Sequence, residues 1–278
     1  MKQSGVSFSK VFIVGTGLMG SSVGLALKGK AERLGADKSN AALERALELN
    51  AIDRTVSIPE GLSVADLVII AIPVQFIPHF IESHTFRAGV TVLDVGSTKR
   101  KVIEAMRKLP ENVYFAGGHP IAGKEKGGAR NADALLFKGK PFILAEESRL
   151  PEEHKKAVLN FVGLLSAYPV WVSAEKHDEM LGLVSHLPYA VSLALFLYVM
   201  RKDENALSLA GSGFRDTTRI ASGDPIMSAG MLQTNADNLK KFITEFIGVL
   251  TDLRDAIDSG ELEKIANRVK KRRDKIWG

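Results

Sequence analysis

The sequence predicts two parts, a doubly wound α/β sheet followed by an all-helical segment. Short apolar runs alternate with helical patterns through the first 173 residues. A glycine-rich turn joins the first apolar run to the first helical pattern, and little beyond residue 175 reads as strand. Such alternation is typical of parallel sheets covered by helices on both faces. We therefore predict one domain at 1–173 and a second at 174–278.

Five buried strands are predicted from short apolar runs, several of which end at Gly or Pro. They cover residues 10–15, 65–73, 89–96, 112–120 and 140–145. Helical patterns occupy residues 39–50 and 99–109, whereas residues 31–37 read as a poor strand. A helix at 150–167 and a short strand at 168–174 complete the first domain. The second domain is predicted from long helical stretches at 175–200, 203–211, 224–257 and 260–275.

The longest apolar run is "LPYAVSLALFLYVM", residues 187–200. It is shorter than a bilayer span of roughly 20 residues, and Pro188 and Ser192 interrupt it. A helix that is apolar on most sides fits the centre of a helical domain or a subunit interface. We expect no membrane span.

The net charge of +5 is concentrated at the C-terminus. Residues 264–278 hold seven Lys or Arg and one Asp, a net of +6, which leaves −1 for the rest. Basic residues at a helix end are favoured by its dipole, and no nucleic-acid motif accompanies them, so we expect no nucleic-acid partner. The absence of cysteine excludes disulfides and thiolate metal sites and fits a reducing cytoplasm, where we expect the protein, without a bound metal.

A dinucleotide site is predicted at "VFIVGTGLMGSS". Gly15, Gly17 and Gly20 have G-x-G-x-x-G spacing directly after a strand and at the start of a helix. The first glycine makes the turn, the second admits the pyrophosphate, and the third packs helix on strand. The amides of Leu18 and Met19, at the helix start, would then face the phosphates. The first domain is therefore Rossmann-like, and the alternative is a glycine-rich turn that binds nothing.

Asp37 lies 17 residues beyond Gly20. A carboxylate there can accept hydrogen bonds from the adenosine ribose and repel a 2′-phosphate, which favours NAD. Asp37 could instead cap a helix and Lys38 could accept a phosphate, so NADP stays open. Pro73 follows a predicted strand where doubly wound folds place ligand-binding loops, or it simply ends that strand.

Three later segments put polar groups at strand ends or helix starts: "DVGSTKRK" (94–101), "GGHPIAGKEKGG" (117–128) and "GSGFRDTTRIASGDP" (211–225). Together with "GTGLMGSS" and "VSHLP", they resemble in order the motifs of the prephenate/arogenate dehydrogenase family of tyrosine biosynthesis. The resemblance implies a Rossmann domain and a helical C-terminal domain that forms a homodimer. It also implies NAD(P)-linked oxidative decarboxylation of prephenate to 4-hydroxyphenylpyruvate, or of arogenate to tyrosine.

The resemblance assigns three residues to the chemistry. His119 is implied to be the base that takes the proton of the ring hydroxyl, which suits an imidazole of pKa about 6.5. Ser97 is implied to hydrogen-bond the substrate hydroxyl and His119, although a serine there could also cap the following helix. Arg219 is implied to hold the ring carboxylate, because a guanidinium offers two parallel donors. Arg219 could instead pair with Asp216 or Asp224, and Arg215 is the other candidate cation.

Further positions bear on substrate recognition and access. His186 matches a family position near substrate or cofactor, but could be a buried structural histidine. Glu125 falls in the family's mobile loop, where it would contact a basic residue and gate access, or be a solvated charge. Tyr189 and Ser228 replace a histidine and an aromatic residue of some relatives where the substrate side chain would lie. Prephenate and arogenate therefore both remain open.

Two other functions are compatible with parts of the sequence. β-Hydroxyacid dehydrogenases rely on a lysine in the helix that opens the second domain. The corresponding stretch here has Lys176 only at its start, which counts against them. A non-catalytic NAD-binding regulator would keep the glycine turn and Asp37, but would have no need for His119 and Arg219 together.

Overall fold

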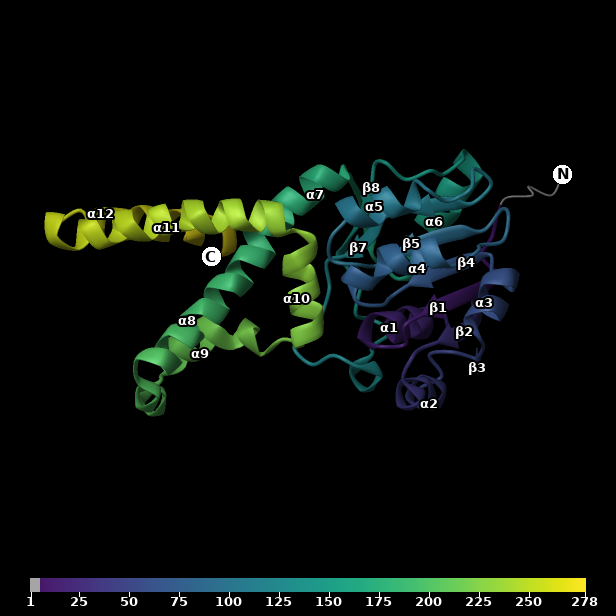
Figure 1. Ribbon diagram of the computed structural model, residues 1–278, viewed down its shortest axis with the longest axis horizontal. Coiled ribbons are helices and arrows are strands. Elements are labelled where there is room, and N and C mark those ends of the chain that lie inside the picture. The colour runs from purple at the N-terminus through teal and green to yellow at the C-terminus, as the bar shows by residue number, and fades with distance from the viewer. Residues whose placement is uncertain (1–5) are drawn as a thin grey trace. The chain divides into compact units, whose positions relative to one another are not determined.

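The computed structural model describes residues 6–278 and contains the predicted doubly wound sheet. Six parallel strands run in the order β3-β2-β1-β4-β5-β6 (Figure 1). They are β1 (Lys10–Val14), β2 (Glu32–Ala36), β3 (Arg54–Thr55), β4 (Leu67–Ile70), β5 (Thr91–Asp94) and β6 (Tyr114–Ala116). The strand order reverses between β1 and β4, and ligands of such sheets bind beyond the carboxyl ends of the strands at this point.

Helices cover both faces of this sheet because alternate strand residues are buried on each side. On one face, Phe12 and Val14 join a core with α3 (Ile58–Val64), α4 (Ile77–Ser83) and α5 (Arg100–Met106). On the other face, Val11 and Ile13 pack with α1 (Leu18–Ala26), α2 (Asn40–Glu48) and α6 (Glu152–Leu164). The α/β prediction is confirmed.

The poor strand predicted at residues 31–37 was underestimated, because β2 forms there and pairs with β1 over its full length. Arg33 is 3% exposed, an unfavourable position for a charge. Its guanidinium donates to the Asp53 carboxylate and to the carbonyls of Gly24 and Asn50. These partners satisfy the buried cation, and they come from segments that local strand propensity does not include.

The predicted strand at 112–120 is in fact two strands in different sheets. β6 ends at Ala116, and β7 (Gly118–Pro120) pairs antiparallel with β8 (Pro141–Ala145). β8 in turn pairs parallel with β9 (Tyr168–Val172), giving a second, three-stranded sheet. The chain changes sheets at Gly117 and Gly118, where an added Cβ would lie 2.7 Å from Ile103 and 2.5 Å from the Asp94 carbonyl respectively. The end of β5 thus packs directly on the strand that carries His119.

The chain beyond β9 is helical among the described residues. Its α-helices are α7 (Ala174–Leu181), α8 (Leu187–Asp203), α9 (Ser212–Thr218), α10 (Pro225–Thr234), α11 (Ala236–Ser259) and α12 (Leu262–Trp277). A π-helical turn, Gly182–His186, joins α7 to α8, and the predicted helix at 203–211 is only a 3-10 turn at Glu204–Leu209.

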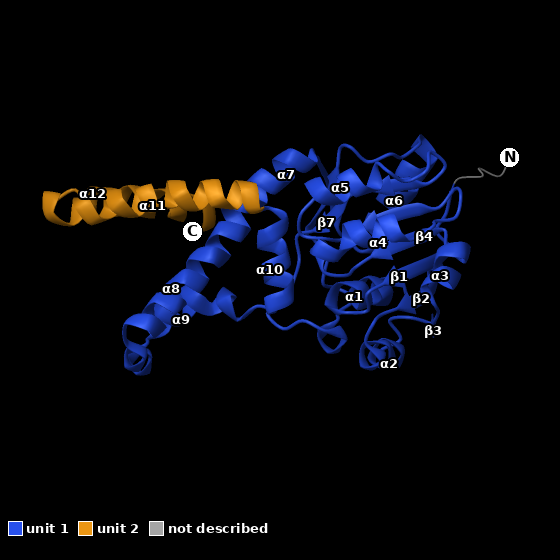
Figure 2. Ribbon diagram, viewed as in Figure 1, with its two compact units in different colours: residues 1–235 blue, residues 236–278 orange. Residues whose placement is uncertain are grey.

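The predicted helix at 224–257 is broken at Asn235, which is fully buried and whose side chain donates to the carbonyl of Asp178. The chain divides into two compact units at the same place, Met1–Asn235 and Ala236–Gly278 (Figure 2). The domain boundary that we placed at residue 173 stays a prediction.

The helical stretch Ala174–Leu209 is long and apolar enough, by length and composition alone, to cross a membrane. Only 17% of its most apolar window is buried inside the structure. Leu193, Leu197 and Met200 on α8 are among its exposed side chains. An exposed apolar face marks a protein interface or a membrane contact, so the expected subunit interface stays a prediction.

The packing of α1 yields a stability prediction. A Cβ on Gly24 would lie 2.0 Å from the carbonyl oxygen of Ala51, a backbone atom that cannot move aside locally. Gly24→Ala should therefore lower the unfolding free energy by about 2–3 kcal/mol in urea titration. Gly163 in α6 is exposed, and no atom lies near its Cβ position. Gly163→Ala should therefore raise the unfolding free energy by about 0.5–1 kcal/mol. Equal effects of the two substitutions would contradict the close approach at Gly24.

Candidate functional site

The turn between β1 and α1 has the shape of a dinucleotide cradle. Gly15 has φ +92°, and a Cβ there would lie 2.6 Å from the carbonyl oxygen of Ala71. A Cβ on Gly20 would meet the carbonyl of Gly15 at 2.0 Å, whereas the Cβ position of Gly17 has no atom within 4 Å. The turn is thus closed toward the sheet and open at Gly17, where a pyrophosphate would approach.

The start of α1 offers donors to an anion. Gly17 is its N-cap residue, and no side chain of the described residues caps it. The amides of Leu18 and Met19 therefore face outward at the positive end of the helix. These observations fit the pyrophosphate of a dinucleotide.

Asp37 lies directly after β2, one strand from the cradle. Its Oδ2 accepts from the amide of Thr16 at 2.7 Å, and its Oδ1 accepts from the amide of Ser39 at 2.9 Å. Ser39 is the N-cap residue of α2, so Asp37 does not have the capping role that we left open. The carboxylate is fixed beside the glycine turn, where an adenosine ribose would lie.

Pro73 lies beyond the end of β4 at Ile70, so it interrupts no strand pairing. It is the N-cap residue of a 3-10 turn, Val74–Phe76. The preceding residues Ala71 and Ile72 pack against Gly15. Pro73 therefore belongs to the loop next to the cradle.

His119 lies at the centre of β7 and is half-buried. Its Nδ1 is 2.9 Å from Nε2 of His177. Burial, followed by the proximity of His177, Lys99 and His186, lowers the pKa of His119 well below its usual 6.5. The imidazole is therefore neutral at neutral pH and able to accept a proton.

His177 and Asp178 are functional candidates that the sequence analysis missed. They lie in α7, and His177 is 1% and Asp178 0% exposed. His177 Nδ1 is 2.7 Å from Asp178 Oδ1. The Asp178 carboxylate also accepts from the amides of Lys99 at 2.7 Å and Arg100 at 3.0 Å, so it caps the N-terminus of α5. The dipeptide "HD" was visible in the sequence, but nothing in its spacing connects it with residue 119.

A buried ion pair lies beneath His119. Lys99 Nζ bonds the Asp94 carboxylate, and both side chains are fully buried. Asp94 also accepts from the amides of Gly96 at 2.8 Å and Gly118 at 3.0 Å. Burial lowers the pKa of Lys99, and the neighbouring carboxylate of Asp94 opposes this. The bond from the Gly118 amide thus ties the Asp94 carboxylate, at the end of β5, to the strand that carries His119.

Ser97 lies in the loop between β5 and α5 and is half-buried. It does not cap α5, because Lys99 occupies the N-cap position. Within residues 6–278 its hydroxyl makes no hydrogen bond to His119. The adjacent Thr98 is buried and donates to Thr234 Oγ1 at 2.8 Å, so it has a structural role.

His186 is buried at the end of the π-helical turn before α8. Its Nδ1 accepts from the Asn235 amide at 3.0 Å. Burial lowers its pKa to about 4, despite the nearby Asp178 carboxylate. His186 is therefore neutral, and it is close enough to His119 to influence the pKa of that residue.

Tyr189 and Ser228 are brought together beside Gly223. The Ser228 Oγ lies 3.2 Å and the Tyr189 ring 3.7 Å from the position that a Cβ on Gly223 would occupy. These are the two positions at which the sequence departs from some relatives.

Arg219 reaches the loop that follows His119. It begins the 3-10 turn Arg219–Ser222, and its Nη1 lies 2.5 Å from Glu125 Oε1. It thus pairs with Glu125 and not with Asp216 or Asp224, the latter being the N-cap of α10. The two side chains are 54% and 70% exposed, and exposed ion pairs are weak.

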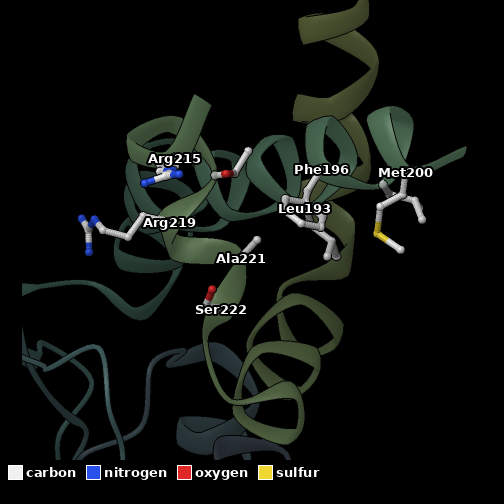
Figure 3. Close-up of a pocket in the computed structure, with 9 residues that line it drawn as sticks. Leu193, Phe196, Met200, Arg215, Arg219, Ala221 and Ser222 are labelled. Carbon is white, nitrogen blue, oxygen red and sulfur yellow. The ribbon is translucent and has the colours of Figure 1, made fainter. Parts of the chain in front are cut away.

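A cavity of about 450 Å³ lies between α8 and residues 215–222, which form the end of α9 and the 3-10 turn after it (Figure 3). Its polar side holds Arg215 and Arg219, and its apolar side comes from α8, with Leu193, Phe196, Leu197 and Met200. His119 does not line it. Arg219 therefore borders both this cavity and the loop after β7.

Comparisons with known proteins cover nearly the whole chain. A family model described as the nucleotide-binding domain of prephenate dehydrogenase matches residues 23–169. One described as the prephenate dehydrogenase dimerization domain matches residues 173–271. The first match begins after the glycine turn, so the cradle is identified by its geometry.

Individual relatives give the same picture. The prephenate dehydrogenase of Bacillus subtilis is 33% identical over 277 residues, which cover 95% of this chain and 74% of the relative. A crystal structure of A. aeolicus prephenate dehydrogenase in complex with hydroxyphenyl propionate and NAD+ is 31% identical. It has a TM-score of 0.89 and covers 98% of this chain and 99% of that one. The Synechocystis arogenate dehydrogenase structure is 26% identical, with a TM-score of 0.77 and coverage of 96% and 99%.

The buried His186 predicts a pH dependence of stability. Its pKa of about 4 lies below the usual 6.5, so the unfolded chain binds more protons between these values. The contribution of His186 to the unfolding free energy is therefore present above about pH 6.5 and is lost as the pH falls toward 4. His186→Gln should reduce the loss of unfolding free energy between pH 7 and pH 4.5 by about 2 kcal/mol in urea titrations. The exposed His79→Gln serves as control, and equal pH dependence of both variants would exclude this role for His186.

Proposed function

The chain belongs to the prephenate dehydrogenase family, and on that premise we propose that it oxidatively decarboxylates prephenate to 4-hydroxyphenylpyruvate with NAD+. The observation that carries the proposal is the placement of a neutral His119 on β7 and of Arg219 against the loop that follows it. A base and a fixed cation are the two groups that an acidic, hydroxylated ring requires. When bound in the cradle, NAD+ supplies the hydride acceptor.

His119 holds the hydroxyl proton of the substrate during the reaction. As the hydride leaves the ring carbon, the attached oxygen becomes more acidic and donates to Nε2 of His119. The bond to the ring carboxylate breaks, its electron pair enters the ring, and CO2 leaves. The aromatic product retains its hydroxyl, so the proton returns to that oxygen. A weak base that must give the proton back is what the lowered pKa of His119 provides.

Arg219 binds a carboxylate of the substrate. Its present partner Glu125 is exposed and monodentate, and such a pair contributes at most about 1 kcal/mol. A substrate carboxylate can displace Glu125 and accept both guanidinium donors. Glu125 then acts as a gate that closes over the site when no substrate is bound.

Ser97 and His186 complete the substrate pocket in this proposal. Ser97 would reach the ring hydroxyl once the substrate is bound, because it follows the end of β5, where Asp94 accepts from the amide of Gly118 next to His119. His186 would donate from Nε2, since its Nδ1 already accepts from Asn235.

Arogenate is the second candidate substrate, because Tyr189 and Ser228 meet beside Gly223. Both side chains offer hydroxyl groups that can accept a hydrogen bond from the amino group of arogenate. The Synechocystis relative is an arogenate dehydrogenase. The ratio of kcat/KM for the two substrates distinguishes the alternatives.

The apolar face of α8 is proposed to form a homodimer interface. The matching family model is a dimerization domain, and the α8 side chains Leu193, Leu197 and Met200 are exposed in the single chain. A cytoplasmic location remains the expectation from the cysteine-free sequence.

The proposed reaction makes His119 its base. Wild-type protein should form NADH from prephenate, and His119→Asn should cut kcat by roughly 10²-fold or more while leaving the affinity for NAD+ nearly unchanged. NADH absorbance and cofactor binding by calorimetry measure the two quantities. NAD+ binding without turnover of prephenate or arogenate by the wild type would instead support a non-catalytic regulator.

The role of Arg219 can be separated from that of its neighbour. Arg219→Gln should lower kcat/KM for the substrate, because a charged hydrogen-bond pair is lost. The loss should correspond to an increase of about 2–4 kcal/mol in activation free energy. Arg215→Gln, on the same cavity, is the matched control and should have little effect. The reverse pattern would assign the carboxylate to Arg215.

Asp37 is proposed to select NAD+ over NADP+. Asp37→Ser removes the negative charge that would repel a 2′-phosphate, so kcat/KM for NADP+ should rise relative to that for NAD+. An unchanged ratio would leave Asp37 with only its hydrogen bonds to Thr16 and Ser39.

A further inference from the structure

His119 is the end of a chain of three hydrogen-bonded side chains. Its Nδ1 is 2.9 Å from His177 Nε2, and His177 Nδ1 is 2.7 Å from Asp178 Oδ1. The two imidazole rings have centroids 5.1 Å apart and are inclined at 65°. This series of side chains starts at β7 in the second sheet and ends inside α7, so two separate elements define its geometry.

The direction of these hydrogen bonds follows from Asp178, the last of the three side chains. Asp178 is bonded by two backbone amides, which can only donate, so its oxygens are acceptors. Burial alone raises the pKa of Asp178, but the bond from His177 and those two amides more than offset this and lower it below its usual value. An ionised Asp178 accepts from His177, so the proton of His177 lies on Nδ1.

The same reasoning continues to His119. Burial lowers the pKa of His177, so that ring is neutral and its Nε2 carries a lone pair. Nε2 of His177 must then accept a hydrogen bond, and Nδ1 of His119 must donate it. Since His119 is neutral too, its remaining nitrogen, Nε2, carries no proton and can act as the base.

We propose that His177 and Asp178 are positioning residues that hold His119 in the tautomer with a bare Nε2 and share the proton it receives. The inference rests on the proposed function, in which His119 takes a hydroxyl proton. When that proton arrives at Nε2, the Nδ1 proton of His119 can shift to Nε2 of His177. The positive charge then lies against the Asp178 carboxylate, and the reverse shift returns the proton to the product oxygen.

A purely structural role for His177 is the competing explanation. Asp178 already caps α5, and the buried His177 could merely add a third hydrogen bond to that carboxylate, at the Oδ1 that also accepts from the Lys99 amide. That role affects stability, whereas a positioning role also affects the proton affinity of His119. The titratable and charged groups that face the two histidines are Lys99, Asp94, Asp178 and His186.

The test compares His177→Gln with a matched control, His154→Gln. The glutamine oxygen at 177 can accept from His119 but cannot take up its proton. We expect kcat to fall roughly 10- to 100-fold with KM for substrate and NAD+ changed less than about threefold. The acidic limb of the kcat/KM profile should move to lower pH, because the glutamine can no longer share the proton that His119 receives.

His154 is buried on α6, bonds the Thr91 hydroxyl at 2.8 Å and has no place in the reaction. His154→Gln should lower the melting temperature while leaving kcat and the pH profile unchanged. A His177→Gln variant that matches His154→Gln in both kinetic measurements overturns the inference.

Asp178→Asn is the second variant. An amide at 178 can still accept from His177 through its oxygen but carries no negative charge, so it cannot stabilise the proton that the two histidines share. We expect kcat to fall on the order of 10²-fold or more with NAD+ affinity retained. If this variant does not fold, because α5 loses part of its cap, the His177→Gln comparison decides. Absence of turnover by the wild type defeats the proposed function instead, and so is distinguished from failure of this inference.

Discussion

The Asp178 carboxylate is the interaction on which the site depends. Its two oxygens accept from the first amides of α5 and from His177, and it is fully buried. A buried charge is tolerated only when it is hydrogen-bonded, and here the donors come from two different elements. The bonds therefore hold α7 against the start of α5, and this contact brings His177 to His119.

The chemical half of the site is rigid and the binding half is movable. Lys99, Asp94 and Asp178 are fully buried and hydrogen-bonded, and Asp94 bonds the Gly118 amide on the strand that carries His119, so this strand is held in place. Arg219 and Glu125 form an exposed pair that a substrate can separate. A preorganised base combined with an exchangeable ion pair suits an enzyme that must admit a charged substrate and then exclude water.

Local sequence patterns predicted most of the strands, the glycine turn and the helical C-terminal part, because burial on both faces of a parallel sheet leaves continuous apolar runs. These patterns failed where contacts with residues distant in the sequence determine whether a strand forms and where it ends. Arg33 lies in a buried strand because Asp53 and two carbonyls satisfy it, and β6 separates from β7 because Ile103 and Asp94 pack against the two glycines. His119 and Arg219 were found through family motifs. His177 and Asp178 were not, because only folding brings residue 177 to residue 119.

The hydrogen-bond direction along the three side chains is the central claim, and nitrogen NMR of the resting enzyme tests it directly. With ¹⁵N-labelled histidine near pH 7, and His119 assigned from a variant that lacks it, the chemical shifts report which ring nitrogen carries the proton. We expect a protonated Nδ1 and a bare Nε2 on His119. A protonated Nε2 with a bare Nδ1 would contradict the account, because the nitrogen meant to receive the substrate proton would already hold one.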